Sequence, residues 1–308
     1  MSADITIEWA DSLWDPVVGC TRKSAACRHC YAEALTAKSA QDQQWGSGFA
    51  EIGPSGSSWT GKIAMRDDRL TLPLTWESPR RILVNALSDL FHEAAPQELI
   101  DRIFAVIALT PHHIFQILTK RPKIMQAYIA DVATPVRIAR MMDEILPEAE
   151  AHSIAAWPLP HVWLGVTAEN QKEADRRIPA LLETPAALRF AAAEPLLEAV
   201  DLKAGIWLRD MAEGQTGPRL DWVVAGGEIG AEAKPCHPDW ARSLRDQCAK
   251  SGTPFFWRQW GEYTPNAGVT AAPLLSAKFA DLKSLAAGGG RQLIGKNTDP
   301  LQHSRGRG

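Results

Sequence analysis

The sequence predicts an α/β fold built on parallel strands. Short apolar runs recur along most of the chain, segments with helical periodicity separate them, and 308 residues suffice for one large α/β domain. Nearly continuous apolar runs are typical of parallel strands that are buried on both faces. Repeated strand–helix units imply right-handed crossovers between such strands. We therefore expect a parallel β/α barrel, full or partial, of about six or seven strands with long loop insertions.

The expected strands are apolar runs that end at polar residues or glycines. A further short strand is expected around residues 16–19, just before the first cysteine. Functional side chains in such folds follow the carboxyl ends of the strands. The six principal strands are expected at residues 81–87, 113–119, 161–167, 188–194, 221–227 and 254–260.

Three segments between these runs have the apolar periodicity of amphipathic helices. Residues 96–109 and 237–250 each place a proline at or near the first helical position, where its missing N–H costs nothing. Residues 170–183 form the third segment, and Pro179 is expected to bend or shorten that helix.

We expect a single domain over residues 1–265. Insertions are predicted at about residues 40–75, 147–160 and 202–220, and the Gly/Ser-rich part of the first is expected to be a long loop over the barrel mouth. A Gly-rich C-terminal extension is expected over residues 266–308.

The composition and net charge of the chain limit which kinds of binding partner are expected. The chain is 45% hydrophobic and 22% charged with a formal net charge of −3, so binding to nucleic acid would need a local basic patch. The N-terminus lacks the pattern of a signal peptide, and no apolar run is long enough to span a bilayer. We therefore expect a cytoplasmic protein with no membrane partner. In that reducing compartment, clustered cysteines favour metal ligands over disulfides.

Three of the five cysteines lie in one short polar stretch, with the spacing Cys-x6-Cys-x2-Cys. They are Cys20, Cys27 and Cys30. Three thiolates from one loop make a soft, all-sulfur metal site. Three ligands without an obvious fourth suit a 4Fe–4S cluster that keeps one iron open for another molecule.

A zinc site is the alternative interpretation. A Cys3His set would take its fourth ligand from His29, His92 or His237. The remaining thiols are expected to pack in the interior: Cys248 lies on the apolar stripe of a predicted helix, and Cys236 precedes that helix.

The cysteine loop followed by a β/α barrel resembles the radical S-adenosylmethionine superfamily. The usual pattern there is Cys-x3-Cys-x-aromatic-Cys; here the first gap is six residues and His29 holds the aromatic position. The chain also resembles a phage and prophage family of radical-SAM-like proteins. The shared stretches are WDPVVGCTRKSAACRHCYAE, NALSDLFHE, LTKRP, GVTAEN, AAEPLL, VVAGGEIG and WRQWGE, which run from residue 14 to residue 262.

This resemblance implies a 4Fe–4S cluster held by Cys20, Cys27 and Cys30 and S-adenosylmethionine as the second cofactor. Reductive cleavage of S-adenosylmethionine would give a 5′-deoxyadenosyl radical, which abstracts hydrogen from a substrate. An electron donor such as flavodoxin or ferredoxin would be a partner.

Polar residues at the predicted strand ends are the candidates for binding S-adenosylmethionine. Ser88 and Asp89 follow one strand, where the superfamily commonly contacts the methionine ammonium group. Lys120, beside Thr119 and Arg121, could pair with the methionine carboxylate. For Lys120 and Arg121, a surface or helix-capping role is an equally good interpretation.

Further candidates follow the later strands. Thr167, Glu169 and Asn170 are expected to bind ribose hydroxyls, although Asn170 could equally cap a helix. Glu194 is a candidate for contacting ribose or substrate. The catalytic candidates are Glu228, in a Gly-Gly-Glu stretch, for substrate or proton chemistry, and Gln259 in the last strand.

The resemblance favours a radical S-adenosylmethionine enzyme of the isomerase or lyase type. We expect its substrate to be an amino-acid-adducted thymine base in phage DNA, in the host cytoplasm. The target base would have to flip out of a duplex to reach a barrel mouth. Two alternatives stay open. One is a radical enzyme that acts on a peptide or a free metabolite. The other is a barrel with a structural zinc site that binds nucleic acid or protein without catalysis.

Overall fold

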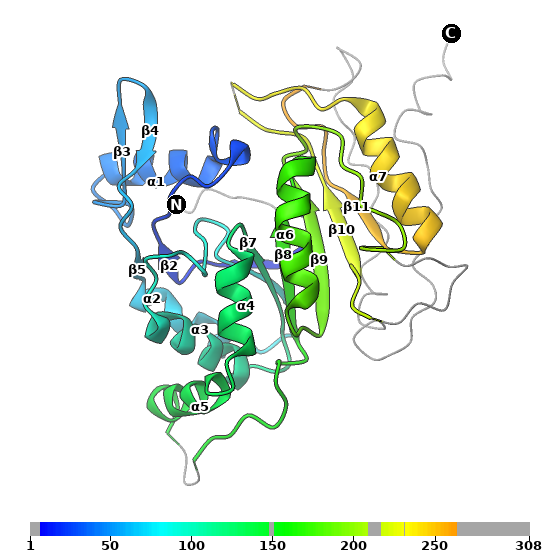
Figure 1. Ribbon diagram of the computed structural model, residues 1–308. Helices are drawn as coiled ribbons and strands as arrows, with labels where there is room; N and C mark the ends of the chain where they lie inside the picture. Colours follow the sequence, from blue (N-terminus) through cyan, green and yellow to red (C-terminus); the bar gives the residue numbers. More distant parts are fainter. Residues whose placement is uncertain (1–6, 148–150, 209–216, 231, 264–308) are drawn as a thin grey trace. The chain divides into compact units, whose positions relative to one another are not determined.

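The computed structural model of the protein describes residues 7–147, 151–208, 217–230 and 232–263 (Figure 1). The chain divides into two compact units: residues 1–166 with 183–188, and residues 167–182 with 189–308. The expected extension at 266–308 and parts of the insertions at 147–160 and 202–220 lie outside the described residues. The single domain over residues 1–265 stays a prediction.

The first unit is built on four parallel strands in the order β1-β6-β7-β8. Trp14 is opposite Val84, Val84 is opposite Ile117, and Ile117 is opposite Leu164, so the apolar runs form adjacent buried rows. Because these strands are parallel, their carboxyl ends meet along one edge. The strands are β1 (Ser12–Trp14), β6 (Arg81–Val84), β7 (Ile114–Thr119) and β8 (Val162–Thr167).

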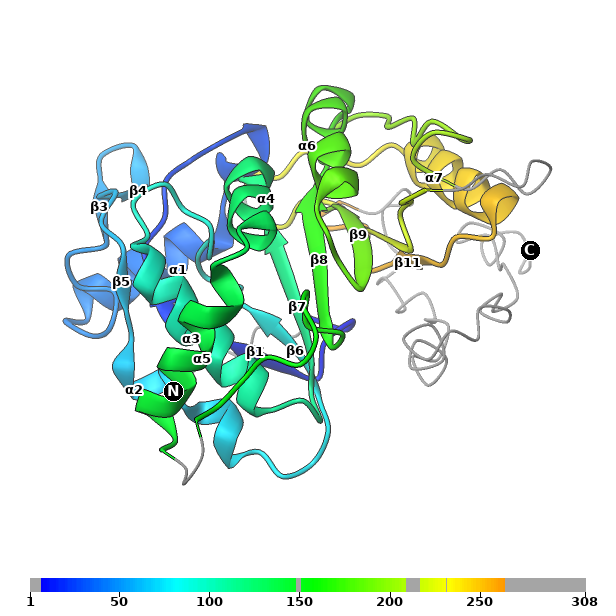
Figure 2. The same cartoon turned by 60° about the horizontal axis from the view of Figure 1, so that its bottom comes forward.

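The helices of this unit follow the amphipathic pattern of the sequence. Helix α3 buries Ile103, Phe104 and Ile107 and packs against α5. Figures 1 and 2 show α3, α4 and α5 grouped together beside the strands. The helices are α1 (Tyr31–Gln41), α2 (Asp67–Leu70), α3 (Gln97–Leu109), α4 (Pro122–Ala130) and α5 (Thr134–Ile145), with 3-10 turns η1 (Ala25–Cys27) and η2 (Leu72–Thr75).

In the N-terminal part of the chain, one expectation was wrong and one was confirmed in part. The first predicted insertion is not a plain loop, because β3 (Ala50–Gly53) and β4 (Gly56–Trp59) form an antiparallel hairpin there. Gly56 turns this hairpin at φ +97, a conformation that favours glycine. The strand expected at residues 16–19 is β2 (Val17–Val18), which pairs antiparallel with β5 (Ala64–Met65) and is no part of the parallel sheet.

The second unit contains three parallel strands in the order β9-β10-β11. Pro238 is the first residue of α7 as predicted, and Gly252 ends that helix in the left-handed conformation. Pro179 lies inside α6 without ending it. The elements are α6 (Gln171–Glu183), β9 (Leu188–Ala193), β10 (Trp222–Ala225), α7 (Pro238–Ser251) and β11 (Phe255–Trp257).

The α/β class and the parallel strands are confirmed. Each of the six predicted principal strands is present and somewhat shorter than expected, because the polar or glycine residues at its ends leave the ladder. The parallel strand missed by the sequence reasoning is β1, whose three residues are too short for a periodic pattern. The barrel itself stays a prediction. No helix in the described part of the chain has the length and apolarity that a bilayer crossing requires.

Candidate functional site

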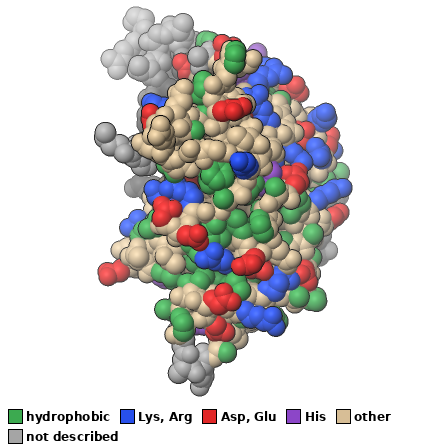
Figure 3. Space-filling view, turned by 90° about the vertical axis from the view of Figure 1, so that its left-hand side faces the viewer, with side chains coloured by type: hydrophobic (Ala, Val, Ile, Leu, Met, Phe, Trp, Pro, Cys, Tyr) green, Lys and Arg blue, Asp and Glu red, His purple; other side chains and the backbone are tan. Residues whose placement is uncertain are grey.

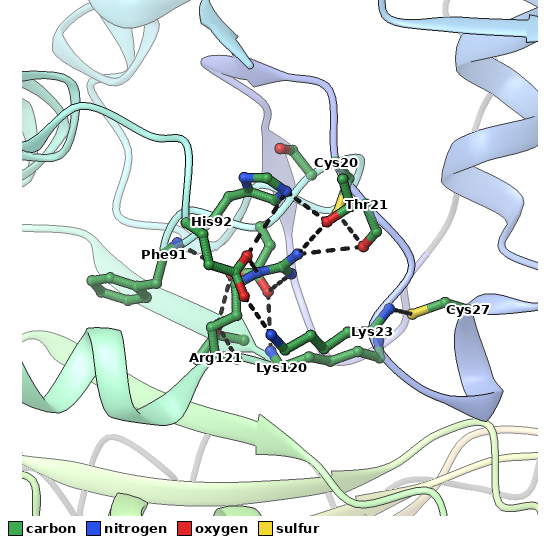
Figure 4. Close-up of polar contacts among 12 residues, drawn as sticks. Cys20, Thr21, Lys23, Cys27, Phe91, His92, Lys120 and Arg121 are labelled. Atoms are coloured by element: carbon green, nitrogen blue, oxygen red, sulfur yellow. Dashed lines mark hydrogen bonds and ion pairs between the residues drawn. The ribbon is translucent and has the colours of Figure 1, made fainter. Parts of the chain in front are cut away.

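The cysteine loop, residues 19–30, lies in the first unit beside the carboxyl ends of its strands. Ser88 and Asp89 follow β6, and Lys120 and Arg121 follow β7, so the sheet order brings these residues to one edge. Figure 4 shows side chains from the loop and from the segments after β6 and β7 pointing toward one another. Of the residues predicted from sequence, this unit therefore brings together three cysteines, Ser88, Asp89 and Lys120.

The three thiols lie within electrostatic range of one another. Negative charge on Cys30 would raise the pKa of Cys20, and charge on Cys27 would raise that of Cys30. Burial is the larger cause in both cases, and it raises the pKa of Cys20 to about 12. Cys20 and Cys30, when no metal is bound, are therefore protonated at neutral pH. A metal centre would displace these protons on binding.

Asp89 and Arg121 form a buried ion pair beside the loop, with Arg121 Nη1 2.9 Å from Asp89 Oδ2. Asp89 Oδ1 also accepts from the Thr119 hydroxyl at 2.6 Å and the Phe91 N–H at 3.1 Å, and Oδ2 accepts from the Lys120 N–H at 3.1 Å. Both carboxylate oxygens are thus engaged. The geometry gives Asp89 a positioning role, and its predicted contact with S-adenosylmethionine stays untested.

Arg121 continues from Asp89 to the cysteine loop. Its Nη2 donates to the Thr21 hydroxyl at 2.8 Å, and its Nε donates to Glu93 Oε2 at 2.5 Å. Although burial alone would lower the pKa of Arg121, Asp89 and Glu93 raise it above its usual value. The guanidinium group is therefore permanently charged, and it binds mainly to other residues of this chain.

His92 completes the contacts of Thr21. Its Nδ1 accepts from the Ala94 N–H at 3.0 Å, which assigns the ring proton to Nε2 in the neutral form. Nε2 then donates to the Thr21 hydroxyl at 2.8 Å. Burial, and then the charge of Arg121, lower the pKa of His92, so this neutral tautomer is the stable one.

The next two loop residues are held by separate carboxylates. Arg22 donates to both oxygens of buried Glu33 on α1, at 2.9 and 2.5 Å. Lys23 forms an ion pair with Glu93. Burial by itself would raise the pKa of Glu93, but hydrogen bonds from Lys23 and then Arg121 lower it to about 2. The carboxylate of Glu93 therefore stays ionised and joins two cations.

The start of the loop is fixed by close backbone contacts. Gly19 has φ +93, and a Cβ placed there would lie 1.9 Å from the carbonyl oxygen of Lys62. Ser88 donates its hydroxyl proton to the Gly19 carbonyl at 2.5 Å. Ser88 thus contacts the backbone directly before Cys20, and its predicted contact with cofactor stays untested.

Lys120 differs from its neighbour Arg121. Burial raises the pKa of Cys30, and the positive charge of Lys120 opposes that rise, which places the ammonium group near the thiol. Within the described residues, no carboxylate forms an ion pair with Lys120. It stays a candidate for an anionic ligand group beside the cysteines.

The zinc interpretation and the cluster interpretation place different demands on the positions of the thiols. In the described part of the chain, no group of three or more His, Cys, Asp or Glu side chains is positioned to hold one. Two of the three histidines proposed as zinc ligands have other contacts: His92 is hydrogen-bonded to Thr21, and exposed His237 caps α7. In a 4Fe–4S cluster each thiolate binds a different iron, so thiols need not converge on one point.

In the second unit, Glu169 and Asn170 take part in a buried network around α6. Arg177 Nη1 lies 2.8 Å from Glu169 Oε2 and donates at 2.8 Å to the carbonyl oxygen of Thr167. Asn170 Oδ1 accepts from the Glu173 N–H at 2.9 Å, so Asn170 caps this helix. The capping interpretation of Asn170 is confirmed, whereas contact of all three predicted residues with ribose stays a prediction.

Glu194 follows β9 and forms an ion pair with Arg258, which follows β11. Gly226 lies against the Glu194 carboxyl group, because a Cβ at Gly226 would be 3.3 Å from its Cδ. The ends of β9, β10 and β11 are thus connected through Glu194. Its predicted contact with ribose or substrate stays untested.

Two glycine turns interlock around Glu228. A Cβ on Gly227 would lie 1.8 Å from the Trp260 carbonyl oxygen, and a Cβ on Gly261 would lie 2.1 Å from that of Glu228. The Gly227 N–H donates to the carbonyl of Gln259 at 2.8 Å, which places the backbone of this second catalytic candidate in the same turn. The backbone around Glu228 is therefore rigidly fixed.

The Glu228 side chain is 4% exposed, and its Oε2 accepts from the Lys234 N–H at 2.8 Å. Its Oε1 is buried and has no hydrogen-bond partner among the described residues. Buried polar atoms are normally paired, so this carboxylate oxygen has capacity left for a hydrogen bond from a water molecule or a ligand. Its catalytic role stays a prediction.

The residues missed by the sequence reasoning are those that hold the others in place. Glu93, Thr21 and Arg177 were not singled out, because their partners lie elsewhere in the chain and no local pattern marks them. Glu93 does lie in the stretch NALSDLFHE, which carried the resemblance. The other two thiols were predicted correctly to be interior: Cys236 and Cys248 are both buried.

Comparison with known proteins identifies a family and no activity. A family model described as "Protein of unknown function (DUF5131)" matches residues 4–301, nearly the whole chain. No curated protein and no solved structure matches the chain.

Proposed function

The chain belongs to the DUF5131 family, and we propose that it is a radical S-adenosylmethionine enzyme with a 4Fe–4S cluster bound by Cys20, Cys27 and Cys30. The observation that carries this proposal is the set of three thiols, close together but not convergent, at the carboxyl edge of a parallel sheet. This donor set fits a cluster better than it fits a single zinc ion.

When bound, such a cluster supplies the electron that cleaves S-adenosylmethionine to methionine and a 5′-deoxyadenosyl radical, which takes hydrogen from the substrate. The chain's own contribution is to position the thiols and the ligand. Asp89 and Arg121 fix the loop, and Lys120 offers an ammonium group near Cys30 for the methionine carboxylate. A donor of the flavodoxin or ferredoxin type would reduce the cluster in the cytoplasm.

The second unit carries the remaining candidate residues. Thr167, Glu169, Asn170 and Glu194 keep their proposed ribose contacts, although Glu169 accepts from Arg177 and Asn170 accepts from the Glu173 N–H. Glu228 is the strongest substrate-facing candidate because one buried oxygen accepts no hydrogen bond. Gln259 is retained as a secondary candidate in the adjoining turn.

For the substrate, we propose an amino-acid-adducted thymine base in phage DNA, rearranged or trimmed by an isomerase or lyase reaction. The resemblance in the stretches from residue 14 to residue 262 supports this choice. Figure 3 shows basic and acidic side chains interspersed on the face in view, so any contact with DNA there would be local.

The first experiment is to purify the protein without oxygen and to measure iron, sulfide and zinc per chain. We expect about four irons and four sulfides, lost in Cys27→Ala and retained in Cys236→Ala, which removes a buried thiol outside the loop. S-adenosylmethionine cleavage, stimulated by modified DNA, would then be assayed.

Zinc alone, persisting after anaerobic reconstitution with iron and sulfide, would overturn the radical mechanism. Cluster binding with cleavage that ignores nucleic acid would instead overturn the DNA substrate and point to a peptide or a free metabolite.

A further inference from the structure

The first gap of the cysteine loop is six residues long, three more than the usual pattern of the superfamily it resembles. Such an enlargement would ordinarily add a mobile surface loop. Here the three residues directly after Cys20 are instead held by three different parts of the first unit. We call residues 21–23 the anchoring segment.

Each residue of the anchoring segment has its own partner. Thr21 accepts from Arg121 at 2.8 Å, Arg22 pairs with Glu33 on α1, and Lys23 pairs with Glu93 in the segment between β6 and α3. Figure 4 shows the Thr21 and Lys23 contacts converging on one side of the loop. The Lys23 N–H also donates to Cys27 Sγ at 3.4 Å, which connects the anchoring segment to the second thiol.

Glu93 connects two of these contacts. One of its oxygens accepts from Arg121 Nε at 2.5 Å, and the other pairs with Lys23. Arg121 in turn is fixed by buried Asp89. A charged group shared by two cations loses less side-chain entropy per contact than two separate pairs would.

We propose that Glu93 is a positioning residue, which holds the anchoring segment so that the thiols of the cysteine loop are arranged before a cluster binds. This rests on the proposed function. It goes beyond the identity of the ligands, because it explains how an enlarged loop can still bind a cluster. Preorganised ligands spare the ordering cost at the moment of binding.

The test compares Glu93→Gln with a matched control, Asp175→Asn. Asp175 also pairs with a lysine, Lys203, and the side-chain exposures are similar: 29% and 46% for Lys23 and Glu93, against 37% and 45% for Lys203 and Asp175. The full-length metal-free protein is treated with trypsin, and cleavage after Lys23 is followed by mass spectrometry. Cleavage of a folded chain reports how often the segment opens.

We expect Glu93→Gln to speed cleavage after Lys23 by about five- to tenfold, because two charge-assisted contacts are weakened. Asp175→Asn should leave this rate unchanged. In the reconstituted protein, Glu93→Gln should lose iron to a chelator faster and change the electron paramagnetic resonance spectrum of the reduced cluster. Glu93→Asp, which keeps the charge, should partly restore both properties.

Unchanged cleavage in Glu93→Gln would overturn the anchoring role. Faster cleavage with unchanged iron retention and an unchanged spectrum would overturn the positioning role. If the wild type binds no iron and sulfide, the proposed function fails, while the cleavage rates still decide whether Glu93 holds the segment.

Discussion

Replacing Asp89 by Asn should destabilise the first unit and loosen the cysteine loop. The change keeps the shape of the side chain but removes its charge. If the Asn carbonyl takes the place of Oδ1, the bonds to Thr119 and Phe91 survive. The amide NH2 then faces two donors, the Lys120 N–H and Arg121 Nη1, which Oδ2 accepts at 3.1 and 2.9 Å.

The expected cost follows from these contacts. Hydrogen bonds to charged groups contribute about 1.5–3 kcal/mol each, and breaking a buried ion pair costs about 3–5 kcal/mol. Because Arg121 keeps its contact with Glu93 in the variant, we expect a loss at the lower end of the range for a broken buried ion pair. We therefore expect the free energy of unfolding to fall by about 3 kcal/mol.

Urea unfolding of the metal-free protein, followed by circular dichroism, measures this change. A double-mutant cycle with Arg121→Met isolates the pair and should give a coupling energy of about 2 kcal/mol. An exposed control, Asp246→Asn, should change stability by less than about 0.5 kcal/mol. A loss below about 1 kcal/mol in Asp89→Asn, with negligible coupling to Arg121, would refute the reasoning.

Three other predictions concern the glycine turn, Glu228 and the buried histidines. Gly227→Ala should lower the free energy of unfolding in urea by more than about 3 kcal/mol, because the added Cβ would meet the Trp260 carbonyl. The control Gly53→Ala, where there is space for a Cβ, should lower it by less than about 1 kcal/mol. Equal losses in the two variants would contradict this prediction. Glu228→Gln should abolish substrate turnover without lowering the midpoint of thermal unfolding. The reason is that it replaces a buried carboxyl oxygen that accepts no hydrogen bond from the described residues. Retained turnover would remove Glu228 from the catalytic set. Burial lowers the pKa of His92, His113 and His161. Their contribution to stability is therefore complete above the unfolded value of about 6.5 and is lost as pH falls below it. The free energy of unfolding in urea should decline between about pH 6.5 and 5, and it should decline less steeply in His113→Asn. A free energy that stays constant over this pH range would argue against the prediction.

Asp15 opposes the histidines in that pH range. Burial raises its pKa to about 6 from an ordinary value of 3.8, so its contribution to stability grows as pH falls through 6. The comparison of the wild type with His113→Asn is therefore more informative than the wild-type profile alone, because Asp15 contributes equally to both proteins.

The six principal parallel strands and the helices α3, α6 and α7 could be predicted because their determinants are local. Apolar runs such as residues 162–167 and the stripe of α3 mark buried elements through spacing alone. The β3–β4 hairpin escaped prediction because its residues are mostly polar or exposed and its strands are four residues long. Helix capping by Asn170 was left open between two roles, and only the bond to the Glu173 N–H decided it.

The same division holds at the candidate site. The spacing of Cys20, Cys27 and Cys30 is a property of one short loop, so the sequence by itself marked them as a probable ligand set. The sequence also placed Asp89 and Lys120 at strand ends. It did not show that Asp89 is already saturated with hydrogen bonds while Lys120 has no carboxylate partner among the described residues.

That distinction depends on residues far apart in the chain. Arg121 meets Thr21 across 100 positions and Asp89 across 32, through the parallel order of β1, β6 and β7. Local spacing carries no information about such pairs, because their separation is set by sheet register and not by helical or strand period. The sequence by itself determined the six principal strands, the thiol-rich loop and the polar residues at the strand ends. Only the tertiary structure decided which charged groups hold that loop and which remain for a ligand.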